Sequence, residues 1–208
     1  MTAPAPLHFY FDFISPFGYF ASLRIDALAA RHGRAVQWHP MLLGVSVMKV
    51  MGLKPLLDTP LKGPYTARDV RRHARLHGIT LGRELDAPMM NPLTAGRAFA
   101  WAQRHHPAAA KALAQAMLQA YWVDGVDLSS PDALLAVALP GHVLALVSAA
   151  ELVAAAQSAE AAQLLRDEVD ASLKAGVFGS PTVVVDGEMF WGVDKLEQVD
   201  AWLERGGW

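Results

Sequence analysis

Ser15 is the residue of this chain whose type and position most suggest chemistry. An apolar run, Leu7 to Phe13, precedes it and predicts a buried strand. Pro16 follows it and is favoured in the first turn of a helix, for which Ser15 is a good N-cap. Backbone N–H groups would converge at this junction, which favours an anion such as a thiolate. The same pattern also fits a plain N-cap without chemistry.

A thiol cannot come from the chain itself, because its 208 residues include no cysteine. Disulfides, thiolate–metal sites and a protein thiol nucleophile are therefore excluded. A metal site is not expected either, since His73 and His77 have helical spacing but lack further ligands. The net charge of −2 gives no support for nucleic-acid binding, and 53% hydrophobic residues predict a well-buried globular protein.

The expected location is the cytoplasm. The first residues lack the basic region and cleavage pattern of a signal peptide. We expect no membrane span, because Pro140, Gly141 and Glu151 interrupt the apolar stretch 133–156.

Segments near the two ends of the chain predict the sheet that positions Ser15. Strands are expected at 7–13, 35–39, 181–186 and 188–191. A helix over 17–31 joins the first two into a parallel strand–helix–strand unit. A turn at Asp186-Gly187, a strong hairpin signal, joins the last two. Asp194 is expected to cap a final helix, with Glu197 completing a capping box.

Between these ends the sequence is helical in character, rich in Ala and Leu, with Pro and Gly separating the segments. The expected helices are 66–77, 94–105, 107–123, 133–139, 143–156 and 159–174. The fold class is therefore α/β, a thioredoxin fold with a large all-helical insertion between its βαβ and ββα halves. Residues 1–41 and 160–208 would form the thioredoxin-like domain, and 42–159 the inserted helical domain.

Five motifs in this order resemble the 2-hydroxychromene-2-carboxylate isomerase family, which is related to kappa-class glutathione transferases and to DsbA-type oxidoreductases. The motifs are FDFISPFGY at 11–19, KGPYTARD at 62–69, PMMNP at 88–92, GVFGSPT at 176–182 and DGEMFWGVDKL at 186–196. In the oxidoreductases a Cys-x-x-Cys pair opens the first helix, where this chain has Ser15-Pro16-Phe17-Gly18. The resemblance implies that glutathione supplies the sulfur and that Ser15 hydrogen-bonds it. Physical chemistry agrees with this role, because a hydroxyl donor at a helix N-terminus would lower the pKa of the glutathione thiol.

The resemblance also implies the rest of a glutathione site. Pro181 corresponds to the cis-proline of the thioredoxin fold. The backbone of Ser180, where the family often has an apolar residue, would pair with the cysteinyl part of glutathione. Val193 and Asp194 match the site for the γ-glutamyl end, and Lys62 matches a lysine near glutathione's carboxylate or the substrate. The alternatives are a trans proline, a simple helix cap at Asp194 and a solvated loop lysine.

Three further positions bear on specificity. Related transferases have an Asn in a Gly-Asn-x-Pro stretch that contacts glutathione, whereas this chain has Leu53, so that contact is lost or replaced. Phe17 and Tyr19 are the aromatic residues expected to wall a substrate pocket. Asn91 would orient the substrate through its amide, or else only bond backbone groups in its turn.

Together these features predict a glutathione-dependent cis–trans isomerase. It would convert 2-hydroxychromene-2-carboxylate, or a similar bicyclic aromatic carboxylate, to the trans-benzylidenepyruvate in aromatic-compound degradation. The expected partners are glutathione and that substrate, with no nucleic acid or membrane and, by family analogy, a homodimer. Two alternatives remain: a kappa-like glutathione transferase or peroxidase acting on other electrophiles, and a non-catalytic DsbA-like binding protein.

Overall fold

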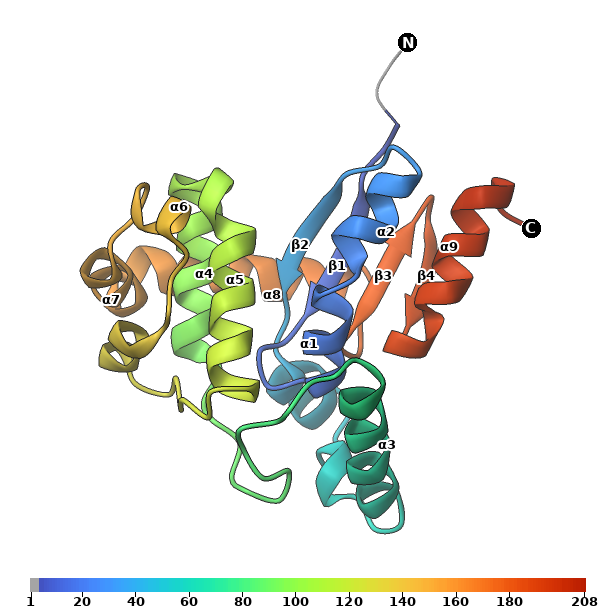
Figure 1. Ribbon diagram of the computed structural model, residues 1–208, viewed down its shortest axis with the longest axis horizontal. Helices are drawn as coiled ribbons and strands as arrows, with labels where there is room; N and C mark the ends of the chain where they lie inside the picture. Colours follow the sequence, from blue (N-terminus) through green and yellow to red (C-terminus); the bar gives the residue numbers. More distant parts are fainter. Residues whose placement is uncertain (1–3) are drawn as a thin grey trace.

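A mixed four-stranded sheet lies at the centre of the computed structural model, which describes residues 4–208 (Figure 1). The strands are β1 (Leu7–Phe11), β2 (Val36–Pro40), β3 (Thr182–Val185) and β4 (Glu188–Trp191), in the spatial order β2-β1-β3-β4. β1 pairs in parallel with β2 and antiparallel with β3, and β3 pairs antiparallel with β4. The predicted α/β thioredoxin fold is confirmed.

Helices and short helical turns (η) make up most of the remaining chain. After β1 come α1 (Pro16–Ser22) and α2 (Ile25–Arg31). Between β2 and β3 lie η1 (Gly44–Val50), η2 (Leu56–Asp58), α3 (Lys62–Leu76), α4 (Leu93–His105), α5 (Pro107–Trp122), η3 (Pro131–Ala136), α6 (Gly141–Leu144), α7 (Ala149–Gln157) and α8 (Ala159–Lys174). The chain ends with η4 (Val193–Lys195) and α9 (Leu196–Arg205). Figure 1 shows α4 to α7 grouped beyond β2, and α8 running behind the sheet.

The single helix expected over 17–31 is wrong, because the chain is broken between α1 and α2. Ser22 Oγ donates to the Tyr19 carbonyl at 2.7 Å, a back-bond that competes with helical hydrogen bonding. Arg24 then has φ −121°, outside helical geometry. The break leaves Leu23 exposed and lets α2 start a new apolar face toward the core.

Three helices of the insertion also differ from expectation. The helix expected over 66–77 is α3, which begins earlier, at Lys62, so Lys62 is not a loop residue. The helix expected over 143–156 is divided into α6 and α7, because Ser148 caps α7 in a complete capping box with Glu151. The segment expected as a helix over 133–139 is instead the 3₁₀ turn η3, which begins at Pro131.

The capping box expected at Asp194 is wrong. The final helix begins at Leu196, after the turn η4, and no side chain caps it. The Asp194 carboxylate accepts instead from Lys195 Nζ at 2.9 Å. A backbone bond of 3.1 Å from Lys195 N–H to the Gly192 carbonyl closes the turn. The Asp194 carboxylate therefore does not cap the N-terminus of α9.

The hairpin expected at Asp186-Gly187 is confirmed. Both residues have positive φ, 53° and 89°, as a two-residue hairpin turn of the primed type requires. Arg34, near the start of β2, binds the Asp186 carboxylate at 2.8 Å. This ion pair connects the two chain segments that build the sheet.

One hydrophobic core joins the sheet to the inserted helices. Phe11 of β1 packs edge-on against Phe99 of α4, with ring centroids 5.3 Å apart. Trp122, at the end of α5, is fully buried, and its indole N–H donates to the Phe13 carbonyl at 3.0 Å. Because this packing crosses between them, we propose that the thioredoxin-like part (1–41 and 160–208) and the inserted part (42–159) unfold together.

The variant Trp122→Phe tests this shared core. It removes the donor to the Phe13 carbonyl and part of a fully buried ring. We expect the free energy of unfolding to fall by about 2–4 kcal/mol in one transition, measured by denaturant titration with circular dichroism. Trp208→Phe, at an exposed position, is the control and should change it by less than about 0.5 kcal/mol. Two separate transitions, with only one affected, would contradict the shared core.

Candidate active site

Ser15 lies at the start of α1, as predicted, and its hydroxyl makes two hydrogen bonds. Ser15 Oγ accepts from Gly18 N–H at 3.0 Å and so caps α1, with Pro16 in the first turn. The hydroxyl donates to the Ser180 carbonyl at 3.0 Å. Ser15 is only 3% exposed. The residue therefore acts both as an N-cap and as the link to a second loop.

That second loop carries the cis-proline. The Ser180–Pro181 peptide bond is cis. Ser180 holds the β1–α1 loop twice, because its carbonyl accepts from Ser15 and its Oγ accepts from Asp12 N–H at 3.0 Å. The Pro181 carbonyl accepts from Gly192 N–H at 2.9 Å, which brings in the end of β4. Three segments distant in sequence thus meet at one place.

The turn η4 completes this cluster. The turn packs beside α1. Because the side chain of Val193 is buried in the core, only the backbone of Val193 could contact a ligand. The Asp194 carboxylate is 66% exposed, and its partner Lys195 is also partly exposed. Exposed ion pairs contribute little, so a ligand ammonium can replace Lys195 at this carboxylate.

Other residues expected at the site lie elsewhere or have other partners. α3 contacts α1 through His73, whose ring is 5.6 Å from that of Phe17, whereas Lys62 opens α3 roughly 16 Å away along the helix. Asn91 Oδ1 accepts from Leu93 N–H at 3.1 Å, which supports its turn role. Leu53 is exposed. The roles of Lys62 and Asn91 toward ligands stay predictions.

The two aromatic residues expected to wall a pocket differ in exposure. Tyr19 is 4% exposed, and burial, followed by the charge of Asp124, raises its pKa. Phe17 is only partly buried. Phe17 is therefore the one of the two that offers a surface to a ligand.

Asp12 is a residue to which the sequence pattern alone assigned no role. It is 1% exposed and follows β1, which ends at Phe11 rather than at Phe13 because Asp12 N–H bonds Ser180 Oγ. Its carboxylate accepts from Leu43 N–H at 2.7 Å and from Ile14 N–H at 3.2 Å. The signal was a carboxyl inside an otherwise apolar run. Its position holds the Ser15 loop and the Ser180 loop in place together.

Burial also controls the ionisation of Asp12. It raises the pKa of the carboxyl from 3.8 to about 7, although hydrogen bonds from the backbone N–H groups of Leu43, Ile14 and Phe13 act in the opposite direction. No cation pairs with this carboxyl in residues 4–208. The buried group therefore favours its neutral form below neutral pH.

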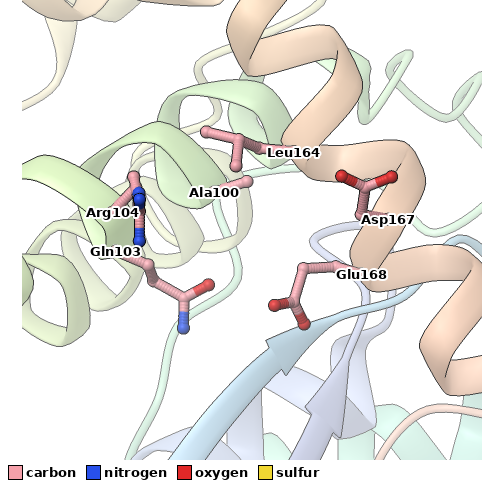
Figure 2. Close-up of a pocket in the computed structure, with 6 residues that line it drawn as sticks. All are labelled: Ala100, Gln103, Arg104, Leu164, Asp167 and Glu168. Carbon is pink, nitrogen blue, oxygen red and sulfur yellow. The ribbon is translucent and has the colours of Figure 1, made fainter.

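The hydrogen-bonded cluster around Ser15 is distinct from two cavities of the molecule. One cavity, of about 240 Å³, lies between α4 and α8. Figure 2 shows the residues that line it, which are Ala100, Gln103, Arg104, Leu164, Asp167 and Glu168. A second cavity, of about 320 Å³, lies along β2 and shares Gln103. Neither is lined by Ser15 or Ser180. The hydrogen bonds around Ser15, rather than these cavities, define the candidate site, because they join the residues expected to bind glutathione. In residues 4–208 no group of three His, Asp or Glu could hold a metal ion.

These features define a thioredoxin-fold protein with a serine where the redox enzymes carry their first cysteine. The chain belongs to the family of DSBA-like thioredoxin domains, whose profile matches residues 6–204. It is 29% identical to the 2-hydroxychromene-2-carboxylate isomerase of Pseudomonas putida over 202 residues, which cover 95% of this chain and 93% of the relative. It is 25% identical to human glutathione S-transferase kappa 1 over 202 residues, covering 93% and 88%.

The solved structures agree. A 2-hydroxychromene-2-carboxylate isomerase superposes with a TM-score of 0.76 at 25% identity, covering 96% of this chain and 94% of that one. The resemblance to the isomerase family seen in the five motifs is therefore confirmed. No helix within residues 4–208 has the length and apolar character needed to cross a bilayer.

The variant Asp12→Asn tests the buried carboxyl. Between pH 3.8 and about 7 the folded state binds more protons at Asp12 than the unfolded state does, so this group's contribution to stability falls as pH rises. Asn does not ionise, so the free energy of unfolding of the variant, relative to that of the wild type, should rise by about 1 kcal/mol per pH unit across that window. Denaturant titrations of both proteins at about pH 5 and about pH 7 measure these free energies. The same difference between variant and wild type at both pH values would contradict the raised pKa of Asp12.

Proposed function

We propose that the protein is a glutathione-dependent isomerase of 2-hydroxychromene-2-carboxylate or a similar bicyclic aromatic carboxylate. The observation that carries the proposal is the 3.0 Å hydrogen bond from the Ser15 hydroxyl to the Ser180 carbonyl. It joins the residue expected to hold the sulfur to the residue expected to pair with the cysteinyl part of glutathione. The similarity to isomerases over nearly the whole chain supports the same activity. A homodimer and a cytoplasmic location stay predictions.

The residues present fit a tripeptide thiol. Gly18 has no side chain between the two serines: a Cβ there would lie 2.8 Å from Ser180 Oγ and 3.3 Å from Ser15 Oγ. The exposed Asp194 carboxylate suits the γ-glutamyl ammonium. Hydroxyl donors suit a thiolate, and the chain supplies no competing thiol.

Each residue then has a defined task. Bound glutathione would supply a nucleophilic sulfur. Its addition would make a double bond of the substrate single for the time that rotation about it requires. Ser15 and the Ser180 backbone hold and orient the cysteinyl part, and Asp194 anchors the other end. Phe17 offers its ring to the aromatic substrate. Lys62 is proposed for the substrate carboxylate, which requires its end of α3 to approach the site.

An ultraviolet assay tests the activity directly. We expect the spectrum of 2-hydroxychromene-2-carboxylate to change rapidly only when both protein and glutathione are present. Ser15→Ala should slow this by roughly tenfold to a hundredfold, because a hydrogen bond to a charged sulfur is lost. S-methylglutathione, which has no free thiol, is the control and should give no turnover. Equal turnover without any thiol would contradict the proposal.

Gly18→Ala separates binding from stability. The new Cβ would push Ser180 Oγ away from Asp12 N–H, which costs about 1 kcal/mol, while alanine favours the helix by a similar amount. We expect stability to change little and the affinity for glutathione, measured by calorimetry, to fall by about tenfold or more. Gly141→Ala, whose Cβ would meet open space, should change neither. Unchanged affinity in Gly18→Ala would contradict a ligand beside Gly18.

A kappa-like transferase is the second candidate. The human relative is a glutathione S-transferase. This chain, however, has Leu53 where the related transferases have an Asn expected to contact glutathione. The same site would then produce a conjugate or oxidised glutathione instead of an isomer, so product analysis separates the two. Ser15, with both its hydrogen bonds made inside the protein, would also fit a non-catalytic protein, which predicts no glutathione binding.

A further inference from the structure

We propose that the side chain of Ser180, and not only its backbone, donates a hydrogen bond to the glutathione sulfur. Ser180 would then be a second catalytic hydroxyl beside Ser15. The inference rests on the proposed glutathione site and adds to it a residue whose type departs from the apolar residue that the family often has there.

The proton of Ser15 is already engaged within the protein. Ser15 Oγ accepts from Gly18 N–H, and its own proton is donated to the Ser180 carbonyl, each bond at 3.0 Å. Ser15 is also almost completely buried. To donate to a sulfur, Ser15 must therefore give up one of the two bonds that hold the loops together.

Ser180 is in the opposite situation. A hydroxyl has one proton to donate and two lone pairs to accept with. The bond from Asp12 N–H at 3.0 Å uses a lone pair of Ser180 Oγ and leaves its proton. No acceptor for that proton is found among residues 4–208, and Ser180 is partly exposed. Ser180 can thus donate to a ligand without breaking any bond in the protein.

Position supports the same conclusion. Both hydroxyls flank Gly18, since a Cβ on that glycine would approach Ser180 Oγ to 2.8 Å and Ser15 Oγ to 3.3 Å. Asp12, itself buried, fixes where Ser180 Oγ lies through its backbone N–H. A sulfur held by the Ser180 backbone would therefore meet the side chain of the same residue.

The chemical consequence is a lower thiol pKa. Hydrogen bonds to the charged form favour it, so a donor from Ser180 stabilises the thiolate over the thiol. The thiol proton leaves to solvent, and no covalent bond of the protein forms or breaks. Loss of one such donor corresponds to roughly one pKa unit.

The experiment measures the ultraviolet absorbance of the thiolate in the glutathione complex as a function of pH. We expect Ser180→Ala and Ser180→Val to raise the pKa of the bound thiol by about one unit. Ser180→Thr keeps the hydroxyl and should restore the wild-type value. Ser180→Ala and Ser180→Val also lose the bond from Asp12 N–H, so their affinity for S-methylglutathione, which has no thiolate, should fall, but by less than their affinity for glutathione. Ser180→Thr should keep both affinities, and thermal melting checks that each variant is folded.

The outcomes distinguish this inference from the proposed function. If wild-type protein binds no glutathione, both are overturned. If it binds glutathione and Ser180→Ala and Ser180→Val leave the thiol pKa unchanged, the role of the Ser180 side chain alone is overturned. If these variants lose affinity for S-methylglutathione as strongly as for glutathione, Ser180 acts only on loop structure, and the inference is again overturned while the glutathione site stands.

Discussion

The candidate site depends on one contact between two loops that lie 165 residues apart in the sequence: the hydrogen bond from the Ser15 hydroxyl to the Ser180 carbonyl. It places the start of α1 against the residue before the cis-proline. The bond from Asp12 N–H to Ser180 Oγ repeats the link at a second point. With two such bonds the loops keep one geometry, which fixes the positions of the two serine hydroxyls.

The buried carboxyl of Asp12 and the buried indole of Trp122 stabilise the loop that makes this contact. Asp12 has no cationic partner in the described part of the chain, and only backbone N–H groups bind its carboxyl. Burial of such a group is unfavourable, and its hydrogen bonds fix the position of the Ser15 loop. Trp122 holds the neighbouring Phe13 carbonyl from the inserted helices. The insertion therefore contributes to the site through the core, even where it does not line it.

Local sequence signals predicted local structure well. The Ser-Pro start of α1 and the Asp186-Gly187 hairpin follow from side-chain capping and backbone preferences, which act over a few residues. Element boundaries were less accessible, because the break at Ser22 is a competition between side-chain and backbone hydrogen bonds within one apolar pattern. Asp12 stood out in the sequence only as a carboxyl within an apolar run, and its role could not be predicted, since its partner Leu43 comes close only in the folded sheet.

The most direct measurement is a crystal structure of the protein with glutathione. We expect the sulfur within hydrogen-bonding distance of both the Ser15 and Ser180 hydroxyls, with the γ-glutamyl ammonium at Asp194. Glutathione bound instead in the cavity between α4 and α8, or with its sulfur turned away from both serines, would contradict it.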